Sequence, residues 1–438
     1  MTDTEETRTV SLYTLGCKVS QYETEAIAEG FEAAGFLRVP FGTAATVTVI
    51  NTCTVTAESD RKCRQIIRRA IKDSPRGLVM VCGCYAQTTP EDVAAIPGVA
   101  YVSGTNGKTR LPALALAMLE EGQAAPIIDV AKLEGAAFEP MCISHAPRTR
   151  AYVKIEDGCE CRCTYCAIPL ARGSVRSKPM ADVIAEVMAL AKTSREVVLT
   201  GIETASWGRD LGDKRLIDLL EAIDREEGAP RIRLGSLSPE LITPDFAARY
   251  GRLRCVAPHL HLSMQSGSDA VLRGMRRRYN TKMALCALDA LRREVRGIQF
   301  TTDLMVGFPG EGDAEFEETL DFCRRARFLD VHVFAYSRRP GTPAAAFDGQ
   351  VEESVKHTRS AALISLKNEI RDEILSEIVA SGESISVLFE TEEGGLLHGH
   401  SDSFLAVCMP AASRGLCGEI VSVRPVRAEG GILWAELI

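Results

Sequence analysis

The sequence of 438 residues lacks any apolar run long enough to span a bilayer, so it predicts no membrane partner. Residues 1–10 are polar and acidic and lack the apolar stretch of a secretory signal, which predicts a cytoplasmic location. Excess positive charge is also missing, because the formal net charge is −8, so the total charge gives no sign of a nucleic-acid partner. Hydrophobic residues make up 46% and charged residues 25%, a globular composition in a chain long enough for two or three domains.

Cysteine, in contrast, is abundant, with 15 residues. A cytoplasmic protein meets reducing thiol pools, so a disulfide framework is disfavoured there. The odd count also fits disulfide pairing poorly. Metal ligation is therefore the leading interpretation of these cysteines.

Positive charge is concentrated locally. Residues 61–76 contain seven basic residues against one acid, with Arg68 and Arg69 at the centre. A second cluster contains Arg273, Arg276, Arg277 and Arg278. Such runs either bind nucleic-acid phosphates or form a solvated helix face, and charge alone does not separate the two.

The pattern of apolar runs predicts a multidomain α/β protein. In residues 7–125, strands alternate with helices, which predicts a Rossmann-like parallel sheet. Residues 126–148 are irregular and predict a linker. Strands are expected at 9–15, 47–51, 78–81 and 99–102, and helices at 23–34, 58–72, 90–96 and 109–121.

Residues 149–381 predict six strand–helix units and a trailing helix at 352–381. This arrangement indicates an open (β/α)6 barrel, and in such barrels chemistry lies at the carboxyl ends of the strands. Residues 382–438 form short β runs separated by glycines, which predicts a small β-barrel of the OB type that binds RNA. The expected barrel strands are 151–155, 196–200, 231–234, 259–263, 299–305 and 332–336.

Three cysteines follow the first expected barrel strand at short spacing. We call Cys159, Cys163 and Cys166 the cysteine clamp. Three thiolates leave one iron of a 4Fe–4S cluster without a protein ligand, and that iron can bind a substrate or cofactor. The alternative is a structural zinc site with Cys161 as the fourth ligand, although its neighbours make tetrahedral closure awkward.

Polar residues and glycines gather at the carboxyl ends of the expected barrel strands. Glycine permits close approach of a ligand to the backbone, and carboxylates and amides can bind an amino-acid group. Each residue alone could equally be a turn or a helix cap, but their shared placement predicts a cofactor-binding rim. The candidates for cofactor contact are Tyr165, Thr200, Gly201, Glu203, Ser236, Gln265 and Arg277, followed by the segment 303–311 at the fifth strand. Arg339, after the last strand, is a candidate for contact with substrate or cofactor.

A second set of cysteines follows three expected strands of the N-terminal domain. We call Cys17, Cys53 and Cys84 the strand-end cysteines. Parallel sheets bind ligands beyond the carboxyl ends of adjacent strands, so these three thiols can converge on one point. Cys82 lies two residues before Cys84, and either could be the ligand. The alternative is three unrelated core cysteines.

Seven segments together resemble the methylthiotransferases of the radical-SAM superfamily. They are 14–19, 21–25, 51–55, 83–87, 157–166, 261–268 and 336–342, and the tail resembles the TRAM RNA-binding module. The resemblance implies that Cys17, Cys53 and Cys84, rather than Cys82, hold an auxiliary 4Fe–4S cluster. It also implies that the clamp holds a second 4Fe–4S cluster, which binds and cleaves S-adenosylmethionine.

Within this family, the segments 16–19 and 21–25 are similar to the branch that acts on N6-threonylcarbamoyladenosine at tRNA position 37. The resemblance implies conversion to the 2-methylthio derivative with two S-adenosylmethionine molecules. It further implies that Arg68, Arg69 and the tail contact the tRNA anticodon arm. Implied partners are a reducing electron donor, such as flavodoxin or ferredoxin, and a sulfur donor. Two positions depart from that branch: Ser20 replaces the usual Asn, and Glu203 replaces the usual His or Asn, which bears on how the cofactor's amino group is held.

Two rival hypotheses remain. One is methylthiolation of a ribosomal-protein aspartate, which needs less RNA contact. The other is an RNA-binding scaffold with structural metal sites and no turnover. The colour of an anaerobic preparation separates the second from an iron–sulfur enzyme.

Overall fold

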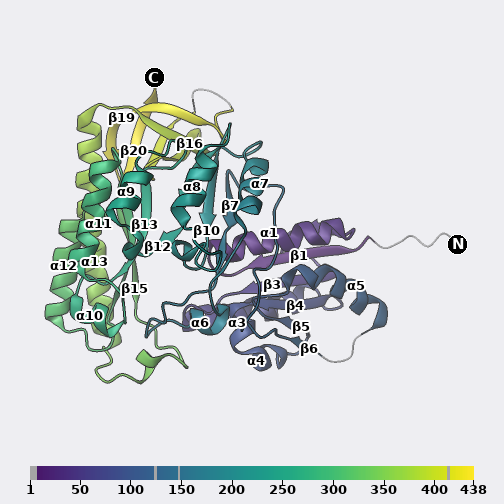
Figure 1. The fold of residues 1–438 in the computed structure, drawn as a ribbon. Helices are drawn as coiled ribbons and strands as arrows, with labels where there is room; N and C mark the ends of the chain where they lie inside the picture. The colour runs from purple at the N-terminus through teal and green to yellow at the C-terminus, as the bar shows by residue number, and fades with distance from the viewer. Residues whose placement is uncertain (1–6, 123–125, 147, 412–414) are drawn as a thin grey trace.

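The computed structural model describes residues 7–122, 126–146, 148–411 and 415–438 (Figure 1). Residues 1–6, which belong to the N-terminal stretch without a secretory signal, lie outside the described residues. So do residues 123–125, at the predicted end of the N-terminal domain, and residue 147, in the predicted linker. Among the described residues, no helix is long and apolar enough to cross a membrane. The mixed α/β fold class is as predicted.

The N-terminal domain is a six-stranded parallel sheet in the order β2-β1-β3-β4-β5-β6. Short strands at both edges, β2 and β6, were not expected, and β6 lies within the stretch predicted as a linker. The strands are β1 (Thr9–Thr14), β2 (Leu37–Val39), β3 (Val47–Thr52), β4 (Leu78–Gly83), β5 (Val99–Ser103) and β6 (Ile127–Asp129).

Helices cover both faces of this sheet, which explains why its central strand β3 is buried along its whole length. One face packs against α1 and α5 and the other against α2 and α4. The α1 helix begins directly after Cys17, five residues before the expected start at 23. The helices are α1 (Lys18–Ala33), α2 (Ala57–Asp73), α3 (Cys84–Thr88), α4 (Pro90–Ala94) and α5 (Leu111–Glu121).

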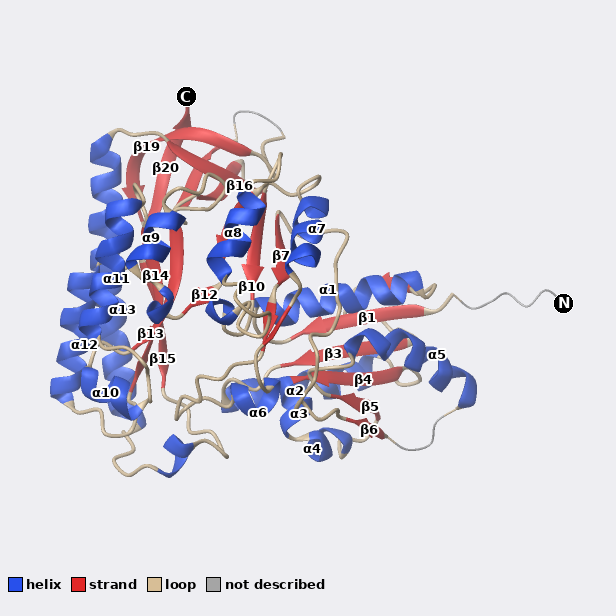
Figure 2. Ribbon diagram, in the orientation of Figure 1, coloured by secondary structure: helices blue, strands red, loops and turns tan. Residues whose placement is uncertain are grey.

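The central domain is an open barrel of parallel strands built from two sheets. The third expected strand is divided at Gly235: β11 (Arg231–Leu234) pairs with β10, and β12 (Ser236–Leu237) pairs with β13. The other strands are β7 (Arg150–Lys154), β10 (Glu196–Thr200), β13 (His259–Gln265), β14 (Gln299–Val306) and β15 (Asp330–Ala335). Helices α7 (Met180–Leu190), α8 (Leu216–Asp224), α9 (Pro244–Tyr250), α11 (Thr281–Glu294) and α12 (Asp313–Ala326) lie around it (Figure 2).

The last helix, α13 (Glu353–Ser381), packs along β15 and leads into a closed five-stranded barrel. The sequence predicts β runs here at 384–389, 404–407, 419–423 and 433–437 and misses one strand, β17, whose alternation is interrupted by Gly399. The strands are β16 (Ile385–Glu393), β17 (Leu396–Ser401), β18 (Ala406–Pro410), β19 (Ile420–Glu429) and β20 (Ile432–Leu437).

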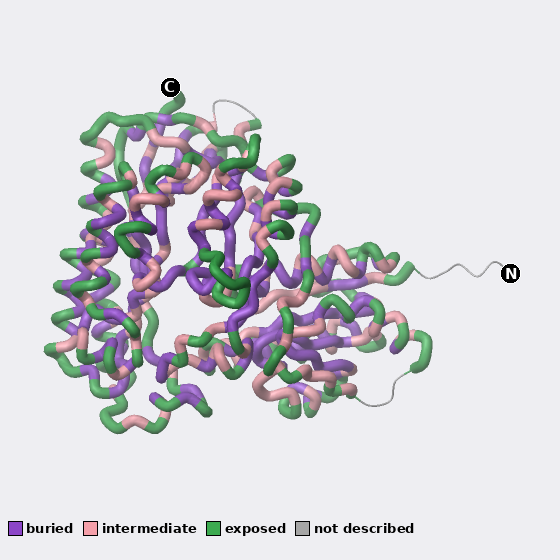
Figure 3. The backbone as a smooth tube through the Cα atoms, in the orientation of Figure 1, coloured by how far each residue is buried: buried purple, intermediate pink, exposed green. Residues whose placement is uncertain are grey.

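The two flanking domains lie at opposite ends of the central barrel. At the amino ends of its strands, Arg233 on β11 donates to the backbone oxygens of Ser401 (3.2 Å) and Asp402 (2.9 Å) in the C-terminal barrel. Phe404 closes this end, stacked on His259 at 4.6 Å between ring centroids. The arrowhead of β10 points away from the C-terminal barrel in Figure 2, so the carboxyl ends lie at the other end of the barrel. Figure 3 shows the strands of both large domains buried beneath more exposed outer helices.

Candidate functional site

The cysteine clamp lies in a loop that leaves the first barrel strand and is closed at its base by a short antiparallel pair. That pair joins β8 (Glu156–Asp157) to β9 (Arg176–Ser177). Gly158 has a φ of +90°, and a Cβ there would lie 2.0 Å from the Ser174 backbone oxygen. Only glycine fits this close approach, so the start of the loop is constrained by its own return strand.

All three clamp cysteines line one cavity of about 430 Å³, at the carboxyl end of β7. A water molecule occupies roughly 30 Å³ of liquid, so this space has room for a four-iron cluster. Cys161 is not among the residues that line the cavity. Three thiols that line one cavity without the fourth match the number of donors that a 4Fe–4S cluster with one open iron requires.

Arg277 places a positive charge against the clamp. Its Nη1 donates to Cys163 Sγ (3.3 Å), and its Nη2 donates to the Ser263 backbone oxygen (3.1 Å) and to Ser238 Oγ (3.3 Å). Burial raises the pKa of the Cys166 thiol to about 12. Because burial disfavours a thiolate, a nearby guanidinium helps to stabilise the negative charge that a cluster ligand carries.

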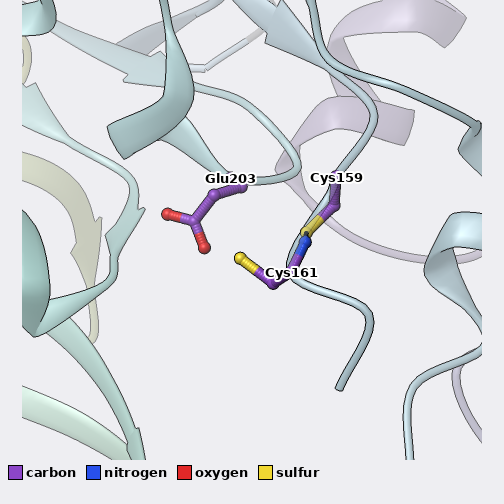
Figure 4. Close-up of side chains that lie close together, drawn as sticks. All are labelled: Cys159, Cys161 and Glu203. Carbon is purple, nitrogen blue, oxygen red and sulfur yellow. Dashed lines mark hydrogen bonds between the residues drawn. The ribbon is translucent and has the colours of Figure 1, made fainter. Parts of the chain in front are cut away.

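Cys161 faces Glu203 rather than the clamp cavity (Figure 4). Donor atoms of Cys159, Cys161 and Glu203 lie within 4.8 Å of one another. Burial raises the pKa of Glu203 to about 7. Its Oε1 atom is buried without a hydrogen-bond partner among the described residues. A buried oxygen of this kind, next to the clamp, suits a ligand that brings its own donor, such as the amino group of S-adenosylmethionine.

Other rim candidates lie at the same end of the barrel. Thr200 ends β10 and is buried. A Cβ on Gly201 would lie 2.6 Å from Glu156 Oε2, and that carboxylate also accepts from the Glu203 backbone N–H (2.8 Å). Glu156, which the sequence analysis overlooked, therefore shapes the turn that carries Glu203.

The remaining candidates for cofactor contact differ in exposure. Ser236 is exposed on β12, and Gln265 ends β13 at a shift of register with a φ of +65°. Tyr165 is half-buried and packs against a small apolar core that includes Met275 and Phe308. All three lie near the carboxyl ends, and their contacts with a cofactor stay predictions.

The strand-end cysteines follow β1, β3 and β4, which are neighbours in the sheet. A Cβ on Gly16 would lie 3.5 Å from Cys53 Sγ, so the chain before Cys17 runs beside Cys53. The charges of Cys84 and Cys17 both bear on the pKa of Cys53, which burial raises to about 11. The three thiols therefore share one neighbourhood, the arrangement expected for a common metal cluster.

Cys82 and Cys84 have different surroundings, although two residues separate them. Cys82 is fully buried in the core on the α1 and α5 side of the sheet. Cys84 accepts a hydrogen bond from Arg172 Nε (3.2 Å), from the central domain. Cys63, on α2, lies close to Cys53 and donates to its backbone oxygen (3.2 Å). Cys84 is thus the one of the pair that faces the interface between the domains.

A buried ion network joins the two cysteine sets. Glu23 on α1 is fully buried and accepts from Lys154 Nζ (2.8 Å) and Arg172 Nη1 (2.6 Å), and also from Lys108. Burial alone would raise the pKa of Glu23, but Arg172, Lys108 and Lys154 hold it well below its usual range. Asp157 accepts from the same Lys154 (2.6 Å) and Arg172 (3.1 Å).

Arg172 therefore touches elements of both sets at once. Its Nε contacts Cys84 Sγ, and its Nη1 contacts Asp157, two residues before Cys159. The side chain is completely buried, and a buried charge persists only where it is paired. The contact fixes the strand-end cysteines against the carboxyl end of the central barrel.

The basic residues singled out from the sequence divide between two places. Arg339 is buried between the domains, where it pairs with Asp60 (2.8 Å) and donates to Thr54 Oγ1 (2.7 Å). Arg68 and Arg69 are exposed on α2, the helix that follows Cys53. The structure thus places Arg339 at the interface that bears Cys53, and leaves the α2 arginines open to solvent.

A further polar group, missed from the sequence, lies on the inner wall of the barrel. Asp303 on β14 lies 3.2 Å from His261 Nε2 on β13 and 3.2 Å from His332 Nδ1 on β15. The sequence predicts Asp303 near the end of its strand, whereas β14 continues to Val306. No short motif joins these residues, because the pairing of neighbouring strands brings them together.

Two family models match separate parts of the chain. Residues 9–104 match the model of the Uncharacterized protein family UPF0004, and residues 153–323 match that of the Radical SAM superfamily. Among solved structures, the radical S-adenosylmethionine methyltransferase TsrM from Kitasatospora setae has a TM-score of 0.59 at 16% identity, covering 89% of this chain and 79% of that one. That likeness shows the fold alone.

Curated relatives are similar over most of the chain. The threonylcarbamoyladenosine tRNA methylthiotransferase MtaB of Bacillus subtilis is 40% identical over 96% of this chain and 94% of its own length. The protein of the same name from Thermotoga maritima is 38% identical over 83% and 82%. The tRNA-2-methylthio-N(6)-dimethylallyladenosine synthase of Parafrankia is 37% identical over 83% and 74%. Members of the radical-SAM superfamily use 4Fe–4S clusters and S-adenosylmethionine, and the donor groups described above fit both. This chain belongs to the radical-SAM methylthiotransferases.

Proposed function

We propose that the protein converts N6-threonylcarbamoyladenosine at position 37 of tRNA into its 2-methylthio derivative, in the cytoplasm. The observation that carries the proposal is the contact of Arg172 with both cysteine neighbourhoods, Cys84 Sγ at 3.2 Å and Asp157 at 3.1 Å. Sulfur insertion at an adenine carbon needs a radical source and a sulfur source at one base. The cysteine clamp and the strand-end cysteines both lie near the interface between the N-terminal and central domains, so one set can hold the radical source and the other the sulfur source.

In this proposal the residues have distinct roles. Cys159, Cys163 and Cys166 hold one 4Fe–4S cluster, and Cys17, Cys53 and Cys84 hold the other. Glu203 and Arg277 position S-adenosylmethionine beside the clamp, with Tyr165, Thr200, Gly201, Ser236 and Gln265 around it. When bound, these groups supply the radical chemistry that an unactivated aromatic C–H requires, and the protein supplies orientation and exclusion of water. Two S-adenosylmethionine molecules serve each product, one as the radical source and one as the methyl donor.

The choice of nucleoside rests on two supports. Relatives named for threonylcarbamoyladenosine are 40% and 38% identical to this chain, although a dimethylallyladenosine enzyme is 37% identical. The barrel also carries Asp303 between two histidines, a polar group that suits an N6 substituent with hydrogen-bond donors better than an apolar dimethylallyl group.

The proposal also assigns the RNA contacts and the partners. Arg68 and Arg69 on α2, together with the C-terminal barrel, bind phosphates of the anticodon arm. Arg339, which follows β15 and contacts Asp60 and Thr54, holds the two domains together next to the substrate site. A flavodoxin or ferredoxin supplies electrons, and a separate donor restores the sulfur that each product removes.

Mass spectrometry of tRNA nucleosides tests this function. We compare cells lacking the gene with the same cells after the gene is restored, and expect restoration to convert threonylcarbamoyladenosine into its 2-methylthio form. A methylthio group on a ribosomal protein instead would retain the chemistry and contradict the substrate. No change in either would favour an RNA-binding scaffold with structural metal sites.

A further inference from the structure

Three neighbouring strands of the central barrel, β13, β14 and β15, present alternate side chains to the outer helices and to the barrel interior. Leu304 on β14 and Val331 on β15 belong to the core that also contains Leu363 of α13, so their side of the sheet faces the outer helices. Asp303 and His332 take the opposite side, because each is next to one of these residues in its strand. The inner wall of the barrel therefore carries these polar side chains.

Asp303 lies between two histidines on this wall. One of its carboxylate oxygens lies 3.2 Å from Nε2 of His261, on β13, and the other lies 3.2 Å from Nδ1 of His332. Ligand atoms from all three residues lie within 4.8 Å of one another. Among the residues that the structure describes, Asp303 pairs with these histidines and with no lysine or arginine. Two imidazoles and one carboxylate that converge in this way are a donor set that binds divalent transition metals.

The separations between these donor atoms match the ligands of one ion better than an ordinary ion pair. A charged hydrogen bond between a ring nitrogen and a carboxylate is usually about 2.7–2.9 Å long. Two neighbouring ligands, each about 2.1 Å from a common ion, lie about 3.0 Å apart in octahedral geometry and about 3.4 Å apart in tetrahedral geometry. The observed 3.2 Å of both nitrogen–oxygen pairs lies between these two values.

The surroundings hold the donors in place and leave a path for an ion. His261 bonds through its other ring nitrogen, Nδ1, to Thr301 Oγ1 (2.9 Å), and a second hydrogen bond of this kind orients a metal-bound imidazole. Burial would raise the pKa of Asp303, but hydrogen bonds from His261 and His332 lower it below its usual range, so the carboxylate is ionised and can bind a cation. The His332 side chain is 57% exposed, which gives an ion access from solvent.

We propose that His261, Asp303 and His332 form a mononuclear site for a divalent first-row transition metal, with zinc as the representative ion. The site uses none of the cysteines, because its ligands are nitrogen and oxygen atoms on β13, β14 and β15. Three protein ligands leave at least one position free for water or for an oxygen donor of a bound molecule. This inference goes beyond the proposed function and does not depend on it.

Zinc binding to the holoenzyme with both clusters reconstituted tests the inference. The protein is equilibrated with Zn²⁺ and freed of excess ion, and zinc and iron are measured by plasma mass spectrometry. We expect the wild type to retain one zinc more per chain than His332→Ala or Asp303→Asn. Thr301→Val keeps all three ligands but removes the hydrogen bond to His261, so it should weaken zinc affinity by about 10- to 100-fold.

His357→Ala, at an exposed histidine on α13, is the matched control and should retain as much zinc as the wild type. Equal iron content and equal far-ultraviolet circular dichroism in all variants exclude loss of a cluster or of the fold. X-ray absorption at the zinc edge of the wild type should show nitrogen and oxygen ligands at about 2.0–2.1 Å, whereas cysteine-bound zinc shows sulfur at about 2.3 Å. Equal zinc in the wild type and His332→Ala, or sulfur ligands alone, would overturn the inference and leave the proposed function intact.

Discussion

The two cysteine sets have opposite origins in the chain. The clamp comes from one loop, in which Cys159, Cys163 and Cys166 lie within eight residues and line one cavity. The strand-end cysteines follow three strands of a parallel sheet, and the first and the last are 67 positions apart. A site made by one loop depends on local backbone geometry, whereas a site made by three strands depends on the whole sheet. Their chemistry should therefore separate cleanly under mutation.

The largest expected effect distinguishes the roles of the two sets. Cys163→Ala should abolish formation of 5′-deoxyadenosine from S-adenosylmethionine, because the clamp loses a ligand. Cys17→Ala should keep deoxyadenosine formation but yield no methylthio nucleoside. Liquid chromatography with mass spectrometry measures both products in one assay. Normal deoxyadenosine formation by Cys163→Ala would contradict the clamp assignment.

Arg172 is the point at which the two sites depend on each other. Arg172→Met leaves Glu23 and Asp157 buried with one cation fewer, and removing one partner of a buried ion pair costs about 3–5 kcal/mol. We expect a large fall in the thermal midpoint and loss of iron from both sites. Arg225→Met, at an exposed arginine paired with Glu221, should change stability by less than about 0.5 kcal/mol. Equal thermal midpoints for the two variants would rule out the linking role.

Two cysteines at the end of β4, Cys82 within the strand and Cys84 directly after it, sharpen the assignment of the strand-end site. Cys84→Ala should remove about half of the iron, the share of one of two equal clusters. Cys82→Ala should keep all of it and lower stability by about 1 kcal/mol, because it only removes a buried side chain from the core. Iron analysis of anaerobically reconstituted protein separates the two. Iron loss from Cys82→Ala alone would reverse the assignment.

The smallest expected effect concerns the contacts of the α2 arginines with tRNA phosphates. Replacing Arg68 and Arg69 with Gln should weaken tRNA binding and reduce the slope of log affinity against log salt by about 2 in total, roughly one for each phosphate contact. Deoxyadenosine formation without tRNA should not change, since Arg68 and Arg69 are exposed to solvent. An unchanged salt slope would show that the α2 arginines form only a solvated face.

The sequence predicted the parts of the molecule that neighbours along the chain define. The clamp spacing, the six strand–helix units and the α2 charge run are all readable within short windows, because period and spacing are local properties. Strands β2, β6 and β17 escaped because each is short or interrupted by glycine. The sequence also does not predict that the third barrel strand is divided at Gly235. A segment of four residues does not show that β11 pairs with β10 while β12 pairs with β13.

The residues that link and line the site could not be predicted in this way. Arg172 contacts Glu23 across 149 positions and Cys84 across 88. Asp303 meets His332 across 29 positions, through the register of β14 and β15. Glu23 and Asp157 belong to segments that resemble the family, but those segments do not indicate that both residues pair with Arg172.

By itself the sequence determined the family, the fold class and the two candidate sets of cysteine ligands, because motif residues and hydrophobic periodicity are written along the chain. Only the tertiary structure decided that Cys84 rather than Cys82 faces the interface, that Arg172 joins the two cysteine sets, and that Asp303 lies between His261 and His332. The physical reason is that burial, charge pairing and strand register depend on distances in space, and the folded chain sets those distances between residues remote in sequence.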